Sequence, residues 1–273
     1  MSTNYVSSFI MGGLGNQLFQ VAVALVYAWK HGTHTPIFSD RPEYRLGEKL
    51  EYNKTIFRHL TWVSEVEFNV LGFEKYRESH FQFSPIPYLP TSLLLEGYFQ
   101  SWKYLDEFKP RLIKELMALT PEDEDVLNRA WKTINPTGKH VLALHVRRGD
   151  YESKQYYHTL IPLSYYERAI KHFSDTLAGV EYVTCVFSDD LDWCKTQPLF
   201  SGYQFWASDV PYIDLLLMSK CHSLIMANSS YSWWAAYISN SNQVVYPNKW
   251  FGPGLAHTDV RDMYPPDWLR IDF

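Results

Sequence analysis

The chain has 273 residues, of which 46% are hydrophobic and 20% charged, as in a folded globular protein with one large domain or two smaller ones. The formal net charge of −5 argues against a nucleic-acid-binding surface, which normally has a basic excess. Aromatic residues make up 17%, which fits either a densely packed core or a sugar-binding site. The three cysteines lack metal-ligand spacing and cannot pair completely, as expected in a reducing compartment.

No segment resembles a signal peptide or a membrane span. Residues 1–10 have no basic side chain and no long apolar run, unlike a secretory signal. The longest apolar helical stretch, 21–29, is shorter than the roughly 20 residues that cross a bilayer. We therefore expect a soluble, cytoplasmic protein that would contact a membrane only at its surface.

The N-terminal part has the pattern of a parallel α/β unit. An apolar segment at 5–11 predicts a strand, 17–30 predicts a helix that stops at Gly32, and 36–39 predicts a second strand. The intervening turn, 12–17, reads Gly-Gly-Leu-Gly-Asn-Gln and is neither a Rossmann fingerprint nor a Walker motif.

Three residues of this turn are candidate ligand-binding groups. Glycine lets backbone approach a ligand closely, and the following helix offers free N–H groups to an anion. Gly13 would contribute backbone, while Asn16 and Gln17 would hydrogen-bond a sugar hydroxyl or a phosphate. A tight turn capped by asparagine is the structural alternative.

The middle of the chain is less regular. Residues 40–90 show no motif, 93–95 predicts a strand, and two helices are expected at 102–118 and 122–134. Thr120-Pro121 has the character of a helix cap and first turn, and the acidic run that follows is typical of a solvated helix start. The segment 135–138 predicts a linker, so we expect two domains, 1–136 and 137–273.

The C-terminal part resumes the alternation of strands and helices. Strands are predicted at 140–146, 182–187 and 222–226, and helices at 163–174, 211–220 and 229–239. The aromatic, proline-rich tail 247–273 is expected to pack back across the body. The predicted fold is α/β, with two Rossmann-like halves facing each other across a cleft.

The segment 145–151, His-Val-Arg-Arg-Gly-Asp-Tyr, is the most informative part of the sequence. It follows a buried strand, and ligands of open α/β sheets bind beyond the carboxyl ends of the strands. The guanidiniums of Arg147 and Arg148 suit bidentate capture of a phosphate, with His145 beside them. An ion pair between Asp150 and an arginine is the structural alternative.

Acidic residues follow the strand at 182–187. Ser188 or Asp189 would cap the next helix in a purely structural interpretation. Functionally, the Asp189 carboxylate suits the N–H edge of a guanine. Asp190 and Asp192 also form the Asp-x-Asp pattern with which metal-dependent glycosyltransferases hold a metal–diphosphate, although such short patterns often arise by chance.

Hydroxyl and amide side chains follow the strand at 222–226. Asn228, Ser229, Ser230 and Tyr231 lie at a helix start, which is an anion-binding position, although a serine cap over a tryptophan core explains the same residues. Three polar helix starts together with an arginine pair favour a diphosphate site. No Ser-His-Asp order or zinc motif supports a hydrolase or a zinc enzyme.

Taken together, the motifs resemble the α-1,2-fucosyltransferases of glycosyltransferase family 11. They occur in the family's order and span nearly the whole chain; they are 12–20, 97–101, 145–151, 187–190 and 228–234. The His-x-Arg-Arg-x-Asp element is shared with α-1,6- and protein O-fucosyltransferases, so it is more specific for GDP-fucose than for the linkage. The resemblance implies a GT-B-like fold, a GDP-β-L-fucose donor, inversion to an α-linked product, and no metal or other cofactor.

The resemblance also implies roles for individual residues. Arg147 would hold the β-phosphate and neutralise charge on the departing GDP, supported by His145 and Arg148, and Asp150 is the nearest candidate for the general base. Asp189 would bind guanine. The expected donor-binding residues are Gly13, Asn16, Gln17, His145, Arg147, Arg148, Asp189, Asn228, Ser229, Ser230 and Tyr231.

The chain departs from the family in one loop. Members often have a His-Gly pair before the Leu-Ser-x-x-Tyr-Tyr helix, whereas 158–162 reads His-Thr-Leu-Ile-Pro here. We expect this loop and 40–90 to shape the acceptor site, so the glycan acceptor stays open. The rival hypotheses are another linkage or GDP-sugar, a metal-dependent transferase using Asp190 and Asp192, and a non-catalytic glycan- or nucleotide-binding protein.

Overall fold

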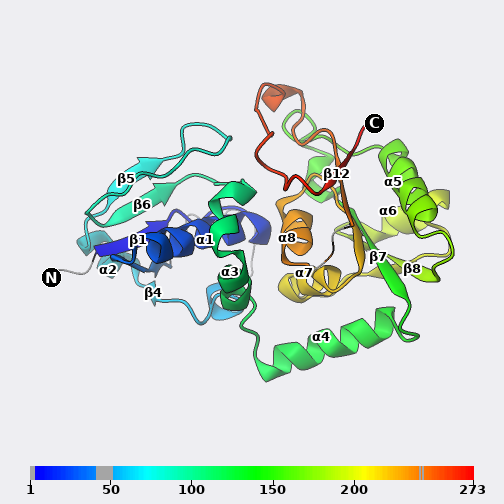
Figure 1. The fold of residues 1–273 in the computed structure, drawn as a ribbon, viewed down its shortest axis with the longest axis horizontal. Coiled ribbons are helices and arrows are strands. Elements are labelled where there is room, and N and C mark those ends of the chain that lie inside the picture. The colour runs from blue at the N-terminus through cyan, green and yellow to red at the C-terminus, as the bar shows by residue number, and fades with distance from the viewer. Residues whose placement is uncertain (1–3, 41–51, 240, 242) are drawn as a thin grey trace. The chain divides into compact units, whose positions relative to one another are not determined.

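The computed structural model describes residues 4–40, 52–239, 241 and 243–273. The chain forms two compact units, one of Met1–Leu119 with Asp259–Tyr264 and the other of Thr120–Thr258 with Pro265–Phe273. Each contains a parallel sheet with helices, which confirms the predicted α/β class (Figure 1).

The division between the units falls earlier than the boundary expected at residue 136. Helix α4 (Pro121–Ile134) belongs to the second unit, where the Tyr212 hydroxyl donates to Asp123 at 2.6 Å. Its cap is as predicted, because Thr120 accepts from the backbone N–H of Asp123. The expected linker 135–138 therefore joins two elements of the same unit.

The first unit is built on a four-stranded parallel sheet. The strand order is β2-β1-β6-β5, with bounds β1 Asn4–Ser8, β2 His34–Pro36, β5 Glu74–Arg77 and β6 Leu93–Glu96. Helix α1 (Leu14–His31) connects β1 to β2 and ends at Gly32, whose φ of +66° is the left-handed cap expected there. The helix begins three residues earlier than predicted, because the glycine turn is short.

Smaller elements complete this unit. The predicted strand 36–39 is divided between β2 and β3, and the predicted helix 102–118 is interrupted by two 3-10 turns before α3 begins. Pro110 lies in the first turn of α3, where its missing N–H is harmless; further inside a helix it would break the hydrogen bonding. The bounds are β3 Phe38–Ser39, β4 Trp62–Val63, α2 Glu65–Val70, α3 Lys109–Leu116, and 3-10 turns at Tyr52–Lys54, Trp102–Tyr104 and Asp106–Phe108.

A short piece of the C-terminal tail completes the first unit. Asp262 accepts hydrogen bonds from the Phe83 backbone N–H at 3.2 Å, and its side chain pairs with Lys103 at 2.5 Å. Its carbonyl oxygen accepts from the Ser101 hydroxyl at 2.5 Å. The tail thus packs back as expected, but 259–264 and 265–273 belong to different units.

The second unit has a six-stranded parallel sheet. The three predicted strands are confirmed as β7, β8 and β10, whereas the short strands β9, β11 and β12 were not predicted. The order is β12-β11-β10-β7-β8-β9, with bounds β7 His140–Val146, β8 Tyr182–Ser188, β9 Gln204–Trp206, β10 Ser223–Ile225, β11 Val244–Pro247 and β12 Leu269–Ile271.

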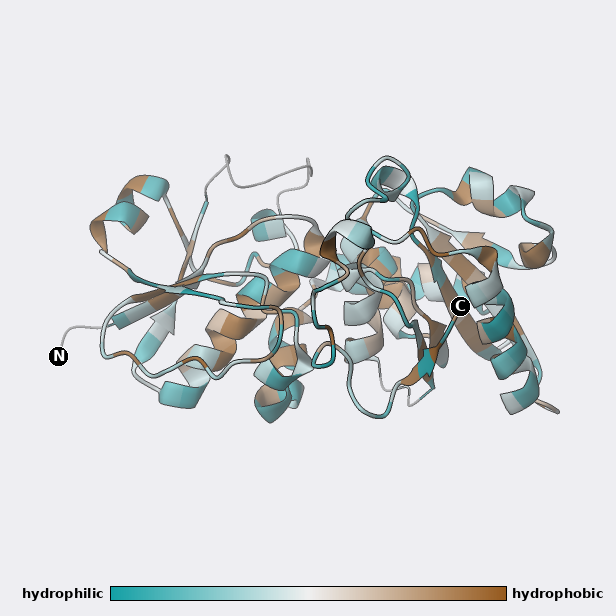
Figure 2. Ribbon diagram, turned by 90° about the horizontal axis from the view of Figure 1, so that it is seen from above, coloured by the Kyte–Doolittle hydropathy of each residue, from teal (hydrophilic) through white to brown (hydrophobic). Residues whose placement is uncertain are grey.

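Helices surround this sheet, and the strands are the most hydrophobic part of the second unit (Figure 2). The predicted helices agree with α5, α7 and α8 to within two residues. None of the described helices has the length and apolar character needed to cross a membrane. The bounds are α5 Leu163–Thr176, α6 Leu191–Thr196, α7 Pro211–Ser219, α8 Ser230–Ile238, and 3-10 turns at Gly149–Tyr151, Pro198–Phe200 and Pro253–Leu255.

Alternation along β7 determines what lies on each face of the sheet. Leu142, Leu144 and Val146 pack in one core cluster with Tyr166 and Phe173 of α5. Because strand side chains alternate, the residues between them face the opposite side. This alternation continues past the end of β7, where it separates the charged side chains of the candidate site.

Candidate active site

The glycine-rich turn after β1 is held by side-chain amides. Gly12 has a φ of +76°, a conformation that favours glycine, and Gly13 is the N-cap residue of α1. The Gln17 amide donates to the Gly12 carbonyl at 2.8 Å, and the Gln100 amide donates to the Asn16 side-chain oxygen at 2.7 Å. The three predicted residues of this turn therefore lie together, joined by Gln100 from the segment after β6.

Glu78 is a half-buried carboxylate that the sequence did not single out. It follows β5 and accepts from the backbone N–H groups of Tyr98 at 2.8 Å and Phe99 at 3.1 Å. Phe99 is fully buried and has a φ of +52°, which is unusual for a residue other than glycine. Burial raises the pKa of Glu78, although both backbone N–H groups oppose the rise. Glu78 thus holds the strained turn that positions Gln100.

The charged segment after β7 divides between the two faces of the sheet. The ring centroid of His145 lies 5.6 Å from that of Tyr231 in α8, whereas Val146 faces the core under α5. Arg148 continues on the side of Val146, and its guanidinium lies 3.7 Å above the ring of Trp193 in α6. The two arginines therefore have different surroundings despite being neighbours in sequence.

Arg147 lies between two carboxylates. Its guanidinium is 2.6 Å from Asp150 and 2.8 Å from Asp189, and 33% of its side chain is exposed. Burial acts to lower the pKa of Arg147, but Asp189, Tyr151 and Asp150 outweigh it and raise the pKa above its usual value. A permanently charged, oriented and partly accessible guanidinium is the arrangement that phosphate recognition requires.

Arg148 attaches the loop to α6. Its side chain is only 12% exposed, pairs with Glu152, and lies 3.4 Å from Asp190 while stacking on Trp193. Arg148 is therefore less accessible to a ligand than Arg147, and its role there would be to support its neighbour.

Asp189 joins the ends of β7 and β8. One carboxylate oxygen pairs with Arg147, and the other accepts from the backbone N–H of Arg148 at 2.9 Å. Gly149 is required beside it, because a Cβ there would overlap the Asp189 carboxylate. The side chain that caps α6 is Asp190, which accepts from the Trp193 N–H at 3.1 Å, rather than Ser188 or Asp189 as the structural alternative had it.

His145 is neutral at physiological pH. Burial, with a smaller contribution from Arg147, lowers its pKa to about 3. Its side chain is buried, and in the described part of the chain its Nδ1 has no hydrogen-bond partner. His145 would therefore support a ligand by hydrogen bonding and not by charge.

Asp150, the predicted candidate for the base, is an ion-pair partner in this structure. It contacts Arg147 at 2.6 Å and Lys154 at 2.8 Å. Burial acts to raise the pKa of Asp150, but Lys154 and Arg147 lower it below the usual value. A carboxylate with a lowered pKa is a weak proton acceptor, so its first effect is to orient Arg147.

The residues after β10 form the expected helix start. The Ser229 hydroxyl accepts from the Tyr231 N–H at 3.3 Å as the N-cap of α8, and Ser230 is the first residue of that helix. The Tyr231 hydroxyl donates to the Pro211 carbonyl at 2.6 Å. Asn228 is buried and uses its amide group to bind backbone carbonyls of neighbouring loops. Its contribution to a donor site is thus to hold the loops around the serines.

The Asp-x-Asp pair does not form a ready metal site. Asp190 is engaged by Trp193 and Arg148, whereas the Asp192 side chain is fully exposed and contacts Lys195 at 3.7 Å. Within the described ranges, no cluster of three or more histidine, cysteine, aspartate or glutamate side chains could hold a metal ion.

The fold of this chain is GT-B-like, as comparison with solved structures shows. The structure of fucosyltransferase NodZ from Bradyrhizobium is similar with a TM-score of 0.60, at 14% identity over 87% of this chain and 94% of that one. E. coli ADP-heptose lps heptosyltransferase II gives a TM-score of 0.51, at 8% identity over 98% and 90% of the two chains.

The sequence comparisons identify the family of glycosyltransferases to which the chain belongs. The profile of Glycosyl transferase family 11 matches residues 53–272, so the chain belongs to this family. It is 29% identical to the O-antigen biosynthesis glycosyltransferase WbnK of Escherichia coli, over 97% of this chain and 99% of that protein. It is also 24% identical to galactoside alpha-(1,2)-fucosyltransferase 2 of Oryctolagus cuniculus, over 96% and 75%. An alpha-1,2-colitosyltransferase of Escherichia coli is 29% identical over 64% and 61%.

Proposed function

We propose that the protein transfers L-fucose from GDP-β-L-fucose to the 2-hydroxyl of a terminal galactoside, with inversion and without a metal ion. The observation that carries this proposal is the accessible guanidinium of Arg147, held between Asp150 and Asp189 at the end of β7. Membership of family 11 supports it, because relatives are named as α-1,2-fucosyltransferases.

The donor would lie along the strand ends of the second unit. Arg147 would bind the β-phosphate, and the N–H groups at the start of α8, with Ser229 and Ser230, would bind the remaining phosphate oxygens or the ribose. Asp189 would accept hydrogen bonds from guanine through lone pairs that its contacts to the arginines leave free. Neutral His145 offers its unpaired Nδ1 to the nucleotide.

The chemistry follows from this placement. The acceptor oxygen forms a bond to the anomeric carbon as the bond to the phosphate oxygen breaks, and the hydroxyl proton passes to a base. The sugar becomes oxocarbenium-like while negative charge grows on GDP, so a fixed cation aimed at that charge lowers the barrier. Arg147 supplies this charge stabilisation. Asp150 is the candidate base nearest to Arg147, and it would act after release from its ion pair with Lys154.

On the acceptor side, the turn of the first unit presents amides suited to neutral hydroxyls. The Gln100 amide donates to the Asn16 side chain, and the Gln17 amide donates separately to the Gly12 carbonyl. Glu78 holds the adjacent turn that positions Gln100. We propose that Gly13 and Asn16 bind sugar hydroxyls and that the surrounding turn contributes to acceptor binding.

A second candidate is transfer of another GDP-linked sugar, because one relative is named for colitosyl rather than fucosyl transfer. The deciding experiment incubates the purified protein with GDP-fucose, EDTA and a panel of β-galactosides, and follows GDP release and product linkage by NMR. A Fuc-α-1,2-Gal product supports donor, linkage and metal independence together.

The other outcomes separate the rival hypotheses. GDP release without a fucosylated product identifies the donor and means that the acceptor is another glycan. Activity that EDTA abolishes and Mn²⁺ restores would favour the Asp190–Asp192 mechanism. Binding of GDP with no turnover of any GDP-sugar would indicate a non-catalytic binding protein.

A further inference from the structure

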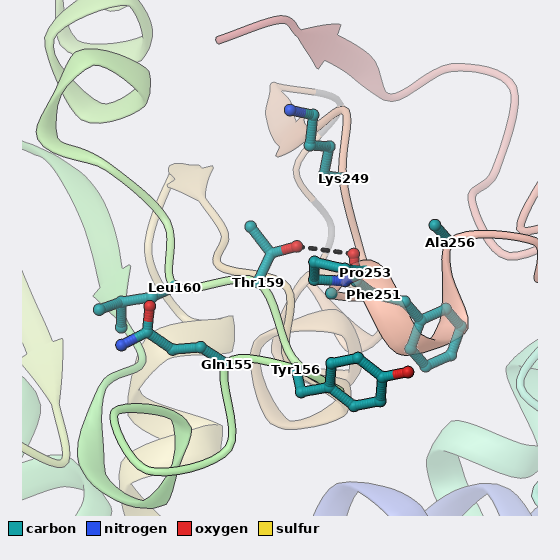
Figure 3. A pocket seen from close by; sticks show the side chains of 9 residues that line it. Gln155, Tyr156, Thr159, Leu160, Lys249, Phe251, Pro253 and Ala256 are labelled. Atoms are coloured by element: carbon teal, nitrogen blue, oxygen red, sulfur yellow. Dashed lines mark hydrogen bonds between the residues drawn. The ribbon is translucent and has the colours of Figure 1, made fainter.

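The second unit contains a cavity of about 660 Å³ that the proposed donor site does not use (Figure 3). Its walls are formed by two loops, 155–160 after β7 and 249–256 after β11. None of the predicted donor-binding residues lines it. The volume lies in the range of roughly 300–1,000 Å³ that small-ligand pockets have, and it exceeds the size of one sugar ring.

Hydrogen bonds between the two loops hold them together. The N–H groups of Gly252 and Gly254 donate to the carbonyls of Tyr157 at 2.9 Å and Tyr156 at 2.7 Å. The Thr159 hydroxyl donates to the Phe251 carbonyl at 2.7 Å. The cavity is therefore formed before any ligand binds, which reduces the ordering cost of binding.

Glycine is needed at both of its positions in the second loop. A Cβ on Gly252 would overlap the backbone of Gln155 and Tyr156, and a Cβ on Gly254 would overlap the ring of Tyr156. The close approach of the 252–254 turn thus sets the position of the Tyr156 ring at the cavity wall.

The cavity wall is also connected to the proposed donor site. The Asn228 amide, one residue before the cap of α8, donates to the carbonyls of Thr159 and Trp250, both at 2.8 Å. Tyr151, which follows the arginine segment, donates to the Asn228 carbonyl at 3.1 Å and stacks on His158 with centroids 4.4 Å apart. A ligand in the cavity would therefore lie beside the loops that hold the donor.

The lining combines aromatic faces with hydrogen-bonding groups. Tyr156, 64% exposed, and Phe251 offer ring faces, whereas Gln155, Thr159 and Lys249 offer an amide, a hydroxyl and an ammonium group. Lys249 and Tyr156 lie on opposite sides of the cavity (Figure 3), and the Lys249 ammonium group lies 5.4 Å from the centroid of the Phe273 ring. Aromatic rings cover the apolar faces of sugars, and groups of this kind bind their hydroxyls.

We propose that this cavity is an extended acceptor subsite, which binds the sugars that precede the terminal galactoside of an oligosaccharide. This inference rests on the proposed galactoside acceptor. It adds that the protein distinguishes oligosaccharides from a single galactoside by stacking one sugar ring on Tyr156 and donating hydrogen bonds from Lys249.

The test measures binding before it measures transfer. Ligand-observed NMR titrations in the presence of GDP would compare a β-galactosyl trisaccharide with methyl β-galactoside. We expect the trisaccharide to bind at least about tenfold more tightly to the natural protein, because the cavity adds an aromatic contact and hydrogen bonds that methyl β-galactoside cannot make. Tyr156→Ala should abolish this preference and leave the affinities for GDP and methyl β-galactoside unchanged.

Three further variants separate the subsite from a general loss of structure. Tyr156→Phe keeps the ring and should keep the preference. Gly254→Ala displaces the ring without removing it and should lose the preference. Tyr88→Ala removes an exposed tyrosine of the first unit that does not line the cavity and should behave as the natural protein. Thermal unfolding and GDP affinity of each variant report whether the fold is intact.

Each outcome decides one proposal separately from the other. Equal binding of the trisaccharide and methyl β-galactoside by the natural protein, or a trisaccharide affinity that Tyr156→Ala leaves unchanged, overturns the subsite. A preference that depends on Tyr156, without transfer of fucose to either acceptor, supports the subsite and refutes the proposed fucosyl transfer. Transfer of fucose that does not depend on Tyr156 supports the proposed fucosyl transfer and overturns the subsite.

Discussion

The turn after β1 and the loop after β7 occupy corresponding places in the two units, each at the end of an interior parallel strand, yet they are built from different chemistry. Neutral amides hold the first, in which Gln100 donates to Asn16. Ion pairs hold the second, in which Arg147 lies between Asp150 and Asp189. Of the two segments, the charged one belongs to the second unit, where we propose that a diphosphate binds, and the uncharged one offers groups suited to neutral hydroxyls. We therefore expect the loop after β7 to stabilise the transition state.

The largest effect is expected for Arg147. Arg147→Ala should lower kcat about 10²–10³-fold, the loss typical of removing one group that stabilises transition-state charge. Arg147→Lys should also fail badly, because one ammonium cannot satisfy both carboxylates and a phosphate. Steady-state kinetics with circular dichroism of the folded variants test this. A near-normal kcat for Arg147→Ala would contradict the charge-stabilisation role.

Asp189 should affect binding more than chemistry. Asp189→Ala removes the proposed guanine acceptor and one of the two partners of Arg147, so we expect GDP affinity to fall about tenfold or more. Calorimetric titration with GDP measures this, and Asp192→Ala, an exposed aspartate on α6, is the matched control. If both variants bind GDP as the natural protein does, the guanine assignment is wrong.

In the first unit the expected effect is on stability. Glu78→Ala leaves the N–H groups of Tyr98 and Phe99 without their acceptor, so the free energy of unfolding should fall by about 1–3 kcal/mol. Denaturant unfolding measures the loss, with Glu74→Ala, an exposed glutamate of β5, as the control. An unchanged free energy of unfolding would show that the turn does not depend on Glu78.

A smaller effect concerns pH and His145. Its folded-state pKa of about 3 lies below the unfolded value of 6.5, so the stability it contributes is present above pH 6.5 and is lost as pH falls toward 3. This single group should lower the free energy of unfolding by up to about 1.4 kcal/mol per pH unit in that window. His145→Gln should reduce the pH dependence, measured by denaturant unfolding at several pH values. Equal slopes would contradict the buried, neutral state.

The sequence predicted strands β7, β8 and β10 and helices α5, α7 and α8 of the second unit, because their signals are local, whereas it did not predict β9, β11, β12 or α6. The strand 140–146 is a run of apolar residues, and its bounds agree with β7. The start of α4 was predicted from Thr120-Pro121 and its end from the following loop. Charged residues at strand ends also identified the candidate donor site before the structure placed them together.

What the sequence did not predict depends on distant partners. Glu78 gave no signal, because its role comes from the turn at 97–100, which packs against it from the next strand in the sheet. The different exposure of Arg147 and Arg148 arises from the stacking of Trp193, which lies 45 residues further along the chain. The cavity walls likewise come from loops about 90 residues apart, and no local pattern records that they meet.

The return of 259–264 to the first unit has a consequence for how the chain folds. Asp262 binds the Phe83 backbone across 179 residues of sequence, and the strand β12 that follows must still join the second sheet. During synthesis, the first unit cannot form these contacts until residues 259–264 have left the ribosome. The segment 259–273 thus completes both units, so a variant truncated before residue 259 would leave each of them incomplete.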